Sequence, residues 1–270
     1  MFSLKGKTAV ITGAAGHLGL AICESLLQYN CNVEVYGRGI KMLKFAEDLQ
    51  NRYGKSKVIA RIVDLYNEKE FEEQLKESIK NNKTIDILIN NAFDFSKDTG
   101  FNDESGRLEN MSKEMFMKGM ESGIYWAFLA TQIIAEKMKK QKSGSIINIS
   151  SVYGHISPSP STYLNTDTFN PITYSIGKSG ILALTRYVSS FYSEFGVRCN
   201  SVSPGMFPNL GKGKNKPTNI VVDRLVEKIP LKRTGHPEDL KGIIVFLSSD
   251  ASSYCTGSDF VVDGGVLSSK

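Results

Sequence analysis

The feature that most constrains the fold of this chain is a glycine-rich turn directly after its first apolar segment. Residues 8–11 form a short apolar run, Gly13, Gly16 and Gly19 follow it, and an amphipathic segment continues to residue 29. A strand, a tight glycine turn and a helix N-terminus together cradle a phosphate, because backbone N–H groups point at the anion and the helix dipole favours negative charge. We therefore expect a phosphate-binding turn here. An ordinary tight connection between strand and helix is the alternative.

Strand-like and helix-like segments alternate along the rest of the chain. We expect strands near residues 7–12, 32–36, 57–63, 85–90, 145–150, 197–203 and 259–262. We expect helices near residues 17–29, 40–53, 67–81, 112–140, 173–195, 218–228 and 237–248. This alternation predicts an α/β fold of the Rossmann type: a doubly wound, seven-stranded parallel sheet flanked by helices on both faces.

No internal repeat or linker divides the sequence, so we expect a single domain over residues 1–270. Two loops are longer than usual, at 152–172 and 205–217, and both follow strands. Ligands in such sheets bind at the carboxyl ends of the strands, so these are the expected substrate loops. Three lysines of the second loop would meet an anionic group or simply face solvent: Lys212, Lys214 and Lys216.

A phenol and an ammonium stand one helical turn apart at Tyr174 and Lys178. A cation close to a phenol favours the phenolate and lowers the pKa of the phenol from about 10 towards the working pH. A tyrosine tuned in this way exchanges a proton with a carbonyl or alcohol oxygen. The same spacing also occurs on solvated helix faces, so the glycine turn at the other end of the chain is needed to favour a catalytic role.

Composition excludes several other classes of protein. The net charge of +5 is spread along the chain and forms no basic stripe, which argues against a nucleic-acid partner and favours small anionic molecules. Four scattered cysteines and three unclustered histidines argue against a metal site and indicate a reduced, cytoplasmic protein. No apolar run has the length of a membrane span, and the fold begins too early for a signal peptide, so we expect no membrane association.

The chain as a whole resembles the short-chain dehydrogenase/reductase (SDR) superfamily, in its short single-domain branch. Besides the glycine turn, the resemblance rests on segments that occur in the family's order: Val63-Asp64-Leu65, Asn90-Asn91-Ala92, Ile149-Ser150-Ser151, Tyr174 to Lys178, Pro204-Gly205, Arg233 to Glu238 and Thr256 to Gly265. The variant with Ser-Val-Tyr-Gly and Pro-Ile-Thr-Tyr looks most like bacterial dehydrogenases linked to nonulosonic-acid sugar and flagellin-modification pathways.

The resemblance implies a role for each matching residue. Tyr174 would be the general acid/base, and Lys178 would lower its pKa and bind the nicotinamide ribose. Ser151 would hydrogen-bond the substrate oxygen, and its neighbour Ser150 is the alternative for this role. Asp64 would bind the adenine amino group, or merely cap a helix. The residues expected at the cofactor are Gly13, Ala15, Gly16, His17, Leu18, Gly19, Arg38, Asp64, Leu65, Asn91, Ala92, Tyr174, Lys178, Pro204, Gly205 and Phe207.

The end of the second strand bears on the choice of cofactor. Gly37 stands where an acidic residue would hold the ribose of NAD, and Arg38 follows it. A guanidinium matches a 2′-phosphate, so we expect a preference for NADP(H). An arginine that only stacks on the adenine would leave NAD(H) usable.

Three positions depart from the family pattern. His17 stands where a glycine is expected, with Gly16 placed as in the extended branch of the superfamily. Phe93 replaces the glycine of the usual Asn-Asn-Ala-Gly. Gly123 falls where the family has an asparagine that holds a water beside the lysine, so a bound water or a neighbour such as Ser122 would have to substitute.

The gap between Ser151 and Tyr174 is about ten residues longer than is usual in the family. The extra segment, residues 163–171, offers hydroxyls, amides, a carboxylate and rings to a polyol or sugar, or else serves oligomer packing. We therefore expect an NADP(H)-preferring oxidoreductase that interconverts a carbonyl and a secondary alcohol on a polar, sugar-like small molecule. The alternatives are a 3-oxoacyl thioester reductase and a catalytically idle NADP(H) sensor or scaffold.

Apolar side chains on more than one face of helices 112–140 and 173–195 predict assembly through helix-to-helix contacts. These side chains are Trp126, Phe128, Leu129, Tyr187, Phe191 and Tyr192. The resemblance implies a homodimer or homotetramer, because the family commonly assembles in this way.

Overall fold

A seven-stranded parallel sheet forms the centre of the structure, as the alternation in the sequence predicts. The computed structural model describes residues 1–167, 169–209 and 220–269. The strands follow the order β3-β2-β1-β4-β5-β6-β7 across the sheet, and all neighbouring pairs are parallel. Their bounds are β1 (Thr8–Thr12), β2 (Asn32–Gly37), β3 (Val58–Ile62), β4 (Ile87–Asn90), β5 (Gly144–Ile149), β6 (Val197–Pro204) and β7 (Asp259–Val262).

Each central strand sends alternate side chains into two separate hydrophobic cores. In β1, Ala9 and Ile11 lie in one core and Val10 lies in the other. In β4, Ile89 and Leu88 divide in the same way. Because these strands are buried on both faces, they appear in the sequence as continuous apolar runs, which is why their positions could be predicted.

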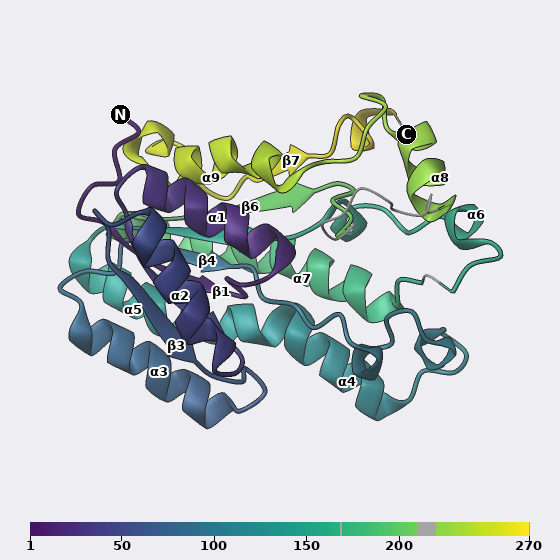
Figure 1. Cartoon of the computed structure of the whole chain (residues 1–270), viewed down its shortest axis with the longest axis horizontal. Helices are drawn as coiled ribbons and strands as arrows, with labels where there is room; N and C mark the ends of the chain where they lie inside the picture. The colour runs from purple at the N-terminus through teal and green to yellow at the C-terminus, as the bar shows by residue number, and fades with distance from the viewer. Residues whose placement is uncertain (168, 210–219, 270) are drawn as a thin grey trace.

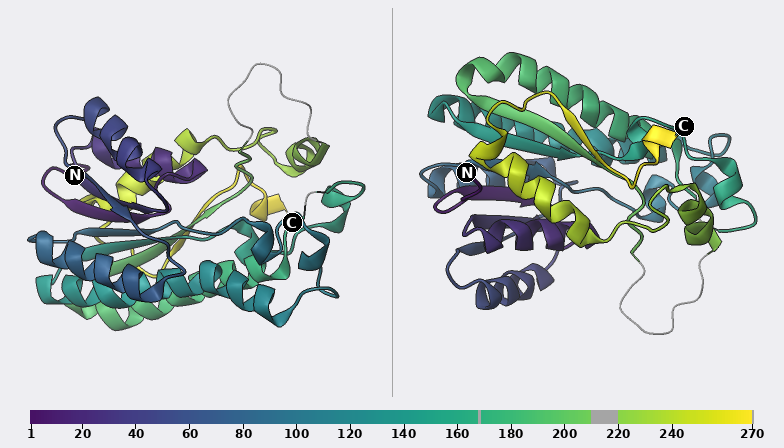
Figure 2. Two further views of the ribbon diagram at one scale, coloured as in Figure 1. Left: turned by 60° about the horizontal axis from the view of Figure 1, so that its bottom comes forward. Right: turned by 90° about the horizontal axis from the view of Figure 1, so that it is seen from above.

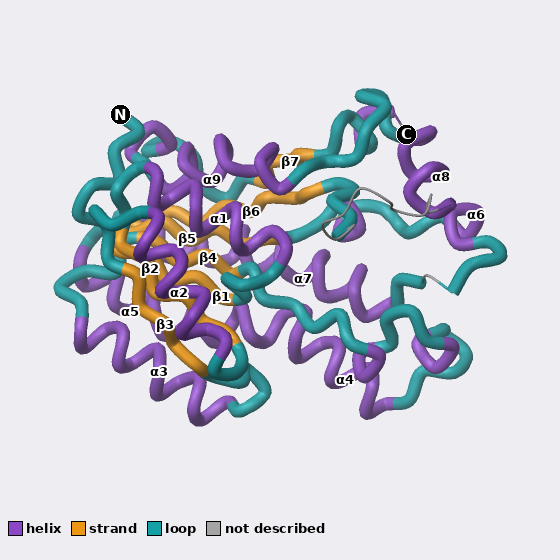
Figure 3. The backbone as a smooth tube through the Cα atoms, in the orientation of Figure 1, coloured by secondary structure: helices purple, strands orange, loops and turns teal. Residues whose placement is uncertain are grey.

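Two layers of helices cover the sheet. The helices are α1 (His17–Gln28), α2 (Lys41–Arg52), α3 (Glu68–Asn81), α4 (Lys113–Met120), α5 (Trp126–Gln141), α6 (Pro160–Tyr163), α7 (Ile172–Tyr192), α8 (Ile220–Lys228) and α9 (Lys241–Ser248). Helices α1, α2 and α9 pack on one face, and α3, α5 and α7 pack on the other (Figures 1 and 2). Figure 3 shows the strands enclosed between these layers. None of the described helices is both long and apolar enough to cross a membrane.

The helix predicted at 112–140 is present without a break in its helical backbone, but it contains a π-helical turn. It consists of α4, a π-helical turn η3 (Glu121–Tyr125), and α5. The predicted helix at 237–248 likewise begins as a separate 3₁₀ turn, η6 (Pro237–Leu240), before α9. Within the 152–172 loop the chain forms the short helix α6, which the sequence analysis did not predict.

The sheet register brings the carboxyl ends of the inner strands to one edge. Thr12 at the end of β1 pairs with Tyr36 of β2 on one side and with Asn90 of β4 on the other. Asn90 in turn pairs with Asn148 of β5. The segments that follow these strands therefore begin side by side, and they form the site described below.

A buried ion pair joins the two outer strands on the other side of β1. Arg61 of β3 donates from Nε to Glu34 of β2 at 2.8 Å, and both side chains are buried. Burial raises the pKa of the Glu34 carboxyl, but hydrogen bonds from Arg61, Ser78 and Asn82 outweigh it and hold the pKa below its usual value. This pair explains how a strand with a central glutamate remains in the core.

Candidate active site

A cleft of about 780 Å³ opens at the carboxyl edge of the sheet, and it collects nearly all the residues that the sequence analysis selected. Those that line it are Gly13, Ala15, Gly16, His17, Leu18, Arg38, Asp64, Leu65, Asn91, Ala92, Ser151, Tyr174, Lys178, Pro204, Gly205 and Phe207. Gly19 is the exception, because it lies beneath the turn. A Cβ at Gly19 would come within 2.2 Å of the carbonyl oxygen of Gly13, so this glycine lets α1 begin against the turn.

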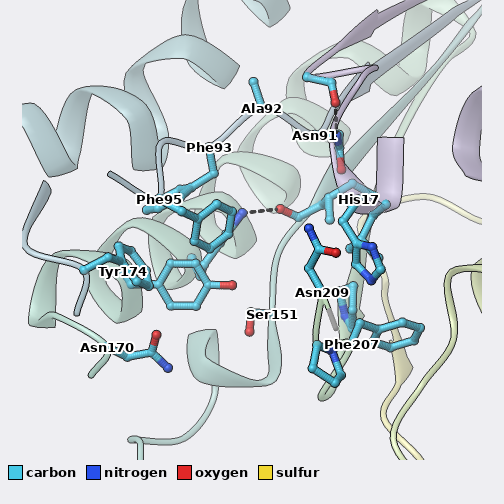
Figure 4. A pocket seen from close by; sticks show the side chains of 18 of the residues that line it. His17, Asn91, Ala92, Phe93, Phe95, Ser151, Asn170, Tyr174, Phe207 and Asn209 are labelled. Carbon is cyan, nitrogen blue, oxygen red and sulfur yellow. Dashed lines mark hydrogen bonds between the residues drawn. The ribbon is translucent and has the colours of Figure 1, made fainter. Parts of the chain in front are cut away.

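The glycine turn approaches the end of β4 too closely for side chains. Gly13 has φ +65°, and a Cβ there would lie 2.7 Å from Cα of Ala92. Asn91 fixes this contact by donating from Nδ2 to the carbonyl oxygen of Gly13 at 2.9 Å (Figure 4). The hydroxyl of Thr12 accepts hydrogen bonds from the backbone N–H groups of Asn91 and Ala92. The first and fourth strands thus hold the turn in one position.

His17 lines the cleft and has a buried ring nitrogen that is unpartnered in the described part of the chain. It is the first residue of α1, where helix N–H groups and the dipole favour an anion. Its Nε2 is buried and has no hydrogen-bond partner among the described residues, and its side chain reaches the cleft (Figure 4). Burial, and then the neighbouring His236, lower the pKa of His17, so the imidazole is neutral at pH 7. In the neutral tautomer that carries the proton on Nε2, this nitrogen could donate to an anion bound at the glycine turn.

Two cations line the end of the cleft beyond β2. Arg38 and Lys41 both reach it. A Cβ at Gly37 would come within 2.6 Å of the sulfur of Met42, so a carboxylate at this position would require Met42 to move. Asp64 also lines the cleft, and it does not cap a helix, because Asn67 is the N-cap of α3.

Tyr174 and Ser151 lie together deeper in the cleft. Tyr174 is in the first turn of α7, and Ser151 is the second residue after β5. Figure 4 shows both side chains in the cleft. Burial raises the pKa of the Tyr174 phenol, and a hydrogen bond with Ser151 opposes this rise only in part. Ser150 points elsewhere: its hydroxyl donates to the backbone carbonyl of Lys178 at 2.8 Å. The structure thus distinguishes the two serines and leaves Ser151 beside the phenol.

Lys178 is buried, and its ammonium does not lower the pKa of Tyr174, contrary to the expectation from their spacing. Nζ donates to the backbone carbonyl of Ile149 at 2.8 Å and lies 5.7 Å from the centre of the Tyr174 ring. Burial lowers the pKa of Lys178 itself to about 8. The i, i+4 spacing brings the two side chains into one cavity. The hydrogen bond to the Ile149 carbonyl then sets the direction in which the ammonium points.

The π-helical turn places Gly123 directly against Gly177 of α7. A Cβ at Gly123 would lie 3.2 Å from Cα of Gly177, and one at Gly177 would lie 2.9 Å from Cα of Gly123. A side chain at position 123 would therefore need α7 to shift by a few tenths of an ångström. Ser122, the neighbour suggested as a substitute, bonds instead to the carbonyl of Gly119.

The segment between β4 and α4 supplies an aromatic cluster that the sequence analysis missed. The Tyr174 ring is surrounded by Phe93, Phe95 and Phe101, whose ring centres lie 5.0, 6.0 and 5.4 Å from its own. All three phenylalanines line the cleft. The spacing Phe-x-Phe after Asn-Asn-Ala is a local signal for Phe93 and Phe95, whereas Phe101 has no signal of this kind.

The extra segment of the 152–172 loop contributes to the cleft as expected. Tyr163 and Asn170 line it, and the Asn170 amide donates to the Tyr163 hydroxyl at 2.8 Å. That hydroxyl lies 3.1 Å from the hydroxyl of Tyr153, which also lines the cleft. Tyr153 was not selected from the sequence, although it follows Ser151 by two residues.

Helix α8 closes the same side and is tied to α6, which lies next to it (Figure 1). Arg224 donates to the backbone carbonyls of Thr162 and Leu164, and Lys228 donates to the hydroxyl of Thr162. Cleft-lining side chains of α8 are Val221, Val222 and Leu225. The predicted loop 205–217 contributes Gly205 to Asn209, and its lysines 212, 214 and 216 lie outside the described residues.

The start of this loop is fixed by packing. The N–H of Gly205 donates to the carbonyl of Val262, and a Cβ at Gly205 would lie 2.7 Å from Cα of Asp263. The Phe207 ring lies against Gly235, where a Cβ would come within 2.4 Å of it. These contacts hold Pro204 and Phe207 at the rim of the cleft, where both line it.

Comparison with known proteins identifies the family to which this architecture belongs. A family model described as "Enoyl-(Acyl carrier protein) reductase" matches residues 13–267. Sorbose reductase sou1 of Schizosaccharomyces pombe is 31% identical over 99% of this chain and 98% of its own length. A 3-oxoacyl-[acyl-carrier-protein] reductase of Synechocystis is 30% identical over 99% of both chains.

The solved structure of a putative short-chain alcohol dehydrogenase from Sinorhizobium meliloti superposes with a TM-score of 0.86. Its sequence is 25% identical, and the match covers 100% of this chain and 99% of that chain. The seven-stranded parallel sheet, the glycine turn at β1 and the whole-length relatives agree. The chain therefore belongs to the short-chain dehydrogenase/reductase superfamily and is an NAD(P)-dependent oxidoreductase of that family.

Proposed function

We propose that the protein interconverts a carbonyl and a secondary alcohol on a polar, sugar-like small molecule, with Tyr174 as the general acid/base. The observation that carries this proposal is the meeting of three groups in the cleft of the glycine turn: the Tyr174 phenol, the Ser151 hydroxyl and the buried ammonium of Lys178. Tyr174 and Lys178 belong to α7, and Ser151 caps the short 3₁₀ turn that follows β5.

In this proposal each residue has a defined part in the reaction. The nicotinamide of a bound cofactor supplies the hydride for reduction, or accepts it in oxidation. The raised pKa of Tyr174 keeps the phenol protonated at neutral pH, so it gives its proton to the carbonyl oxygen during reduction. Ser151 donates a hydrogen bond to the same oxygen as its negative charge develops. Lys178 would bind the nicotinamide ribose rather than stabilise the phenolate, since its ammonium is held at the carbonyl of Ile149 and does not lower the pKa of Tyr174.

We further propose that the protein prefers NADP(H) to NAD(H). Arg38 and Lys41 form a cationic end to the cleft, and Met42 occupies the space that an acidic side chain at position 37 would need. A guanidinium and an ammonium bind a 2′-phosphate more strongly than a hydroxyl.

The nature of the substrate is supported by the side of the cleft beyond Tyr174. Asn170, Tyr163 and Tyr153 present an amide and two hydroxyls there, which suits the hydroxyls of a sugar or polyol. The similarity to a sorbose reductase agrees with this choice. The aromatic cluster of Phe93, Phe95 and Phe101 favours a second candidate, a 3-oxoacyl thioester, whose apolar chain would pack on the rings.

The test is a binding and turnover assay on the purified protein. NADPH fluorescence titration gives cofactor affinity, and NADPH oxidation is then followed with keto-sugars and with acetoacetyl thioesters. Tyr174→Phe should abolish turnover and leave the affinity for NADPH nearly unchanged. Tyr187→Phe, an exposed tyrosine on the same helix, is the matched control and should retain full activity.

Two outcomes would overturn the proposal. Activity that survives Tyr174→Phe would remove the phenol from the chemistry. Tight NADPH binding without turnover of any substrate in the panel would favour the idle sensor or scaffold.

We also propose that the protein forms a homodimer or homotetramer in the cytoplasm. Tyr187 and Phe191 on α7 stack on each other and are more than half exposed, and Phe128 on α5 is also exposed. Trp126 and Leu129, which the sequence analysis placed with them, are buried in the core instead. The four cysteines are free thiols, which suits a reducing compartment. Light scattering measures the mass of the assembly.

A further inference from the structure

The Phe93 ring occupies a position between the catalytic candidates and the π-helical turn. Its centre lies 5.3 Å from Nζ of Lys178 and 5.0 Å from the centre of the Tyr174 ring, to which it is perpendicular. Its Cε2 atom lies 3.6 Å from the position that a Cβ at Gly123 would take. The ring thus fills space beside Gly123 and also covers the ammonium of Lys178.

Besides Phe93, only two groups of the described structure stand against the charge of Lys178: the carbonyl of Ile149 and the Tyr174 ring, whose centre lies 5.7 Å from Nζ. The ammonium has three hydrogens to donate. The carbonyl oxygen of Ile149 accepts one hydrogen bond, and Lys178 forms no ion pair with any carboxylate in the described parts of the chain. A buried ammonium with so few partners gains from an aromatic face within about 6 Å of it, and this gain is largest where water is excluded.

We propose that Phe93 is a positioning residue that holds the ammonium of Lys178 against its π face, compensating for the side chain that Gly123 lacks. The catalytic role of this contact rests on the proposed function, in which Tyr174 is the general acid/base. The perpendicular contact with Tyr174 lets the same ring fix the phenol relative to the ammonium. A single side chain would then order both the phenol and the ammonium.

The other rings of the aromatic cluster do not share this contact. Phe101 is buried, and its ring centre lies 5.6 Å from that of Phe93 and 5.4 Å from that of Tyr174. Among the described residues, the Phe101 ring makes no cation–π contact with Lys178. Phe101 is therefore a matched control, because replacing it perturbs the same cluster and leaves the cation–π contact of Phe93 in place.

The charged groups on neighbouring elements are engaged elsewhere. Asp94, next to Phe93, accepts hydrogen bonds from Tyr66 and Ser96. On α4, Lys118 pairs with Asp98. Glu121 of η3 interacts with Glu68, Lys118 and Asp64. Arg198 of β6 donates to backbone carbonyls of residues 247–255. The hydroxyls of Tyr153 and Tyr163 bond to each other. Burial is the cause that sets the pKa of Lys178.

The experiment titrates Lys178 in the protein without cofactor. Lysine labelled with ¹³C at Cε gives one NMR signal per lysine, and the Lys178→Met variant identifies the signal of interest. In Phe93→Leu the aromatic face is lost while a similar apolar volume remains. The pKa of Lys178 should fall from about 8 by roughly one unit more, because the charged form loses a π partner. Phe93→Tyr should restore the original value, and Phe101→Leu should not change it.

A pKa that stays the same or rises in Phe93→Leu would overturn the proposal and make the ring simple core packing. If Phe93→Leu does not fold, as judged by circular dichroism, Phe93→Met provides the same test with a flexible side chain. The readout needs neither cofactor nor substrate, so its failure is distinguishable from a failure of the proposed function.

In an active enzyme, the alkaline limb of the pH profile of kcat should move to lower pH in Phe93→Leu and return in Phe93→Tyr.

Discussion

Replacing Lys178 with methionine should change how the stability of the protein depends on pH. Burial lowers the pKa of Lys178 from 10.5 to about 8, so between these values the unfolded chain binds a proton that the folded protein has released. The wild-type protein therefore gains stability as the pH rises through this window, whereas the variant has no such group. Each pKa unit corresponds to about 1.36 kcal/mol.

The size of the effect follows from the two pKa values. Between pH 7 and pH 10 the free energy of unfolding of the wild type should rise relative to Lys178→Met by about 2.5 kcal/mol, with roughly 1.4 kcal/mol of this reached by pH 9. Urea denaturation of both proteins without cofactor, at pH 7, 8, 9 and 10, measures the difference directly. Lys44→Met replaces an exposed lysine on α2 and is the control. Its free energy of unfolding should change with pH in the same way as that of the wild type.

Two parallel curves for the wild type and Lys178→Met would refute the reasoning, because they would mean that the ammonium is as well stabilised in the fold as in water. A relative loss of wild-type stability with rising pH would refute it as well, since this would require a pKa above 10.5.

Three further predictions concern the cofactor, the helix contact and the buried ion pair. Arg38→Ala should weaken NADPH binding about tenfold in fluorescence titrations and leave NADH unaffected, and equal weakening of both would exclude a 2′-phosphate contact. Gly177→Ala should cost about 1–3 kcal/mol in urea denaturation, whereas Gly180→Ala on the same helix, where a Cβ has 3.4 Å of space, should cost little. Arg61→Met should leave Glu34 buried without its partner and cost roughly 3–5 kcal/mol at pH 7. This deficit should shrink as the pH falls below 5 and Glu34 becomes protonated, and a deficit independent of pH would contradict the pairing.

The order of strands and helices could be predicted because it depends on local patterns. Strands such as β1 and β4 are buried on both faces and therefore have continuous apolar sequences. The π-helical turn at Glu121–Tyr125 could not be predicted, because it depends on the contact between Gly123 and Gly177, which are far apart in the chain. An uninterrupted α-helix was the natural expectation for the sequence alone.

The site could be predicted in part for the same reason. The glycine turn, Ser151 and Tyr174 belong to short motifs, and the fold brings them into one cleft. The direction of the pKa shift of Tyr174 was predicted wrongly, because residue spacing says nothing of burial or of the carbonyl that Lys178 reaches. The contact of Phe101 with Tyr174 joins residues far apart in sequence, so no local pattern announces it.

The bonds from Arg224 and Lys228 to α6 join two segments that lie some 60 residues apart in the chain. These bonds hold α6 and α8 together where Tyr163 and Val221 line the cleft. The two helices are therefore already fixed relative to each other before a substrate binds, so binding does not incur the entropy cost of ordering one against the other. Removing these bonds should weaken substrate binding more than it disturbs Tyr174, Ser151 and Lys178.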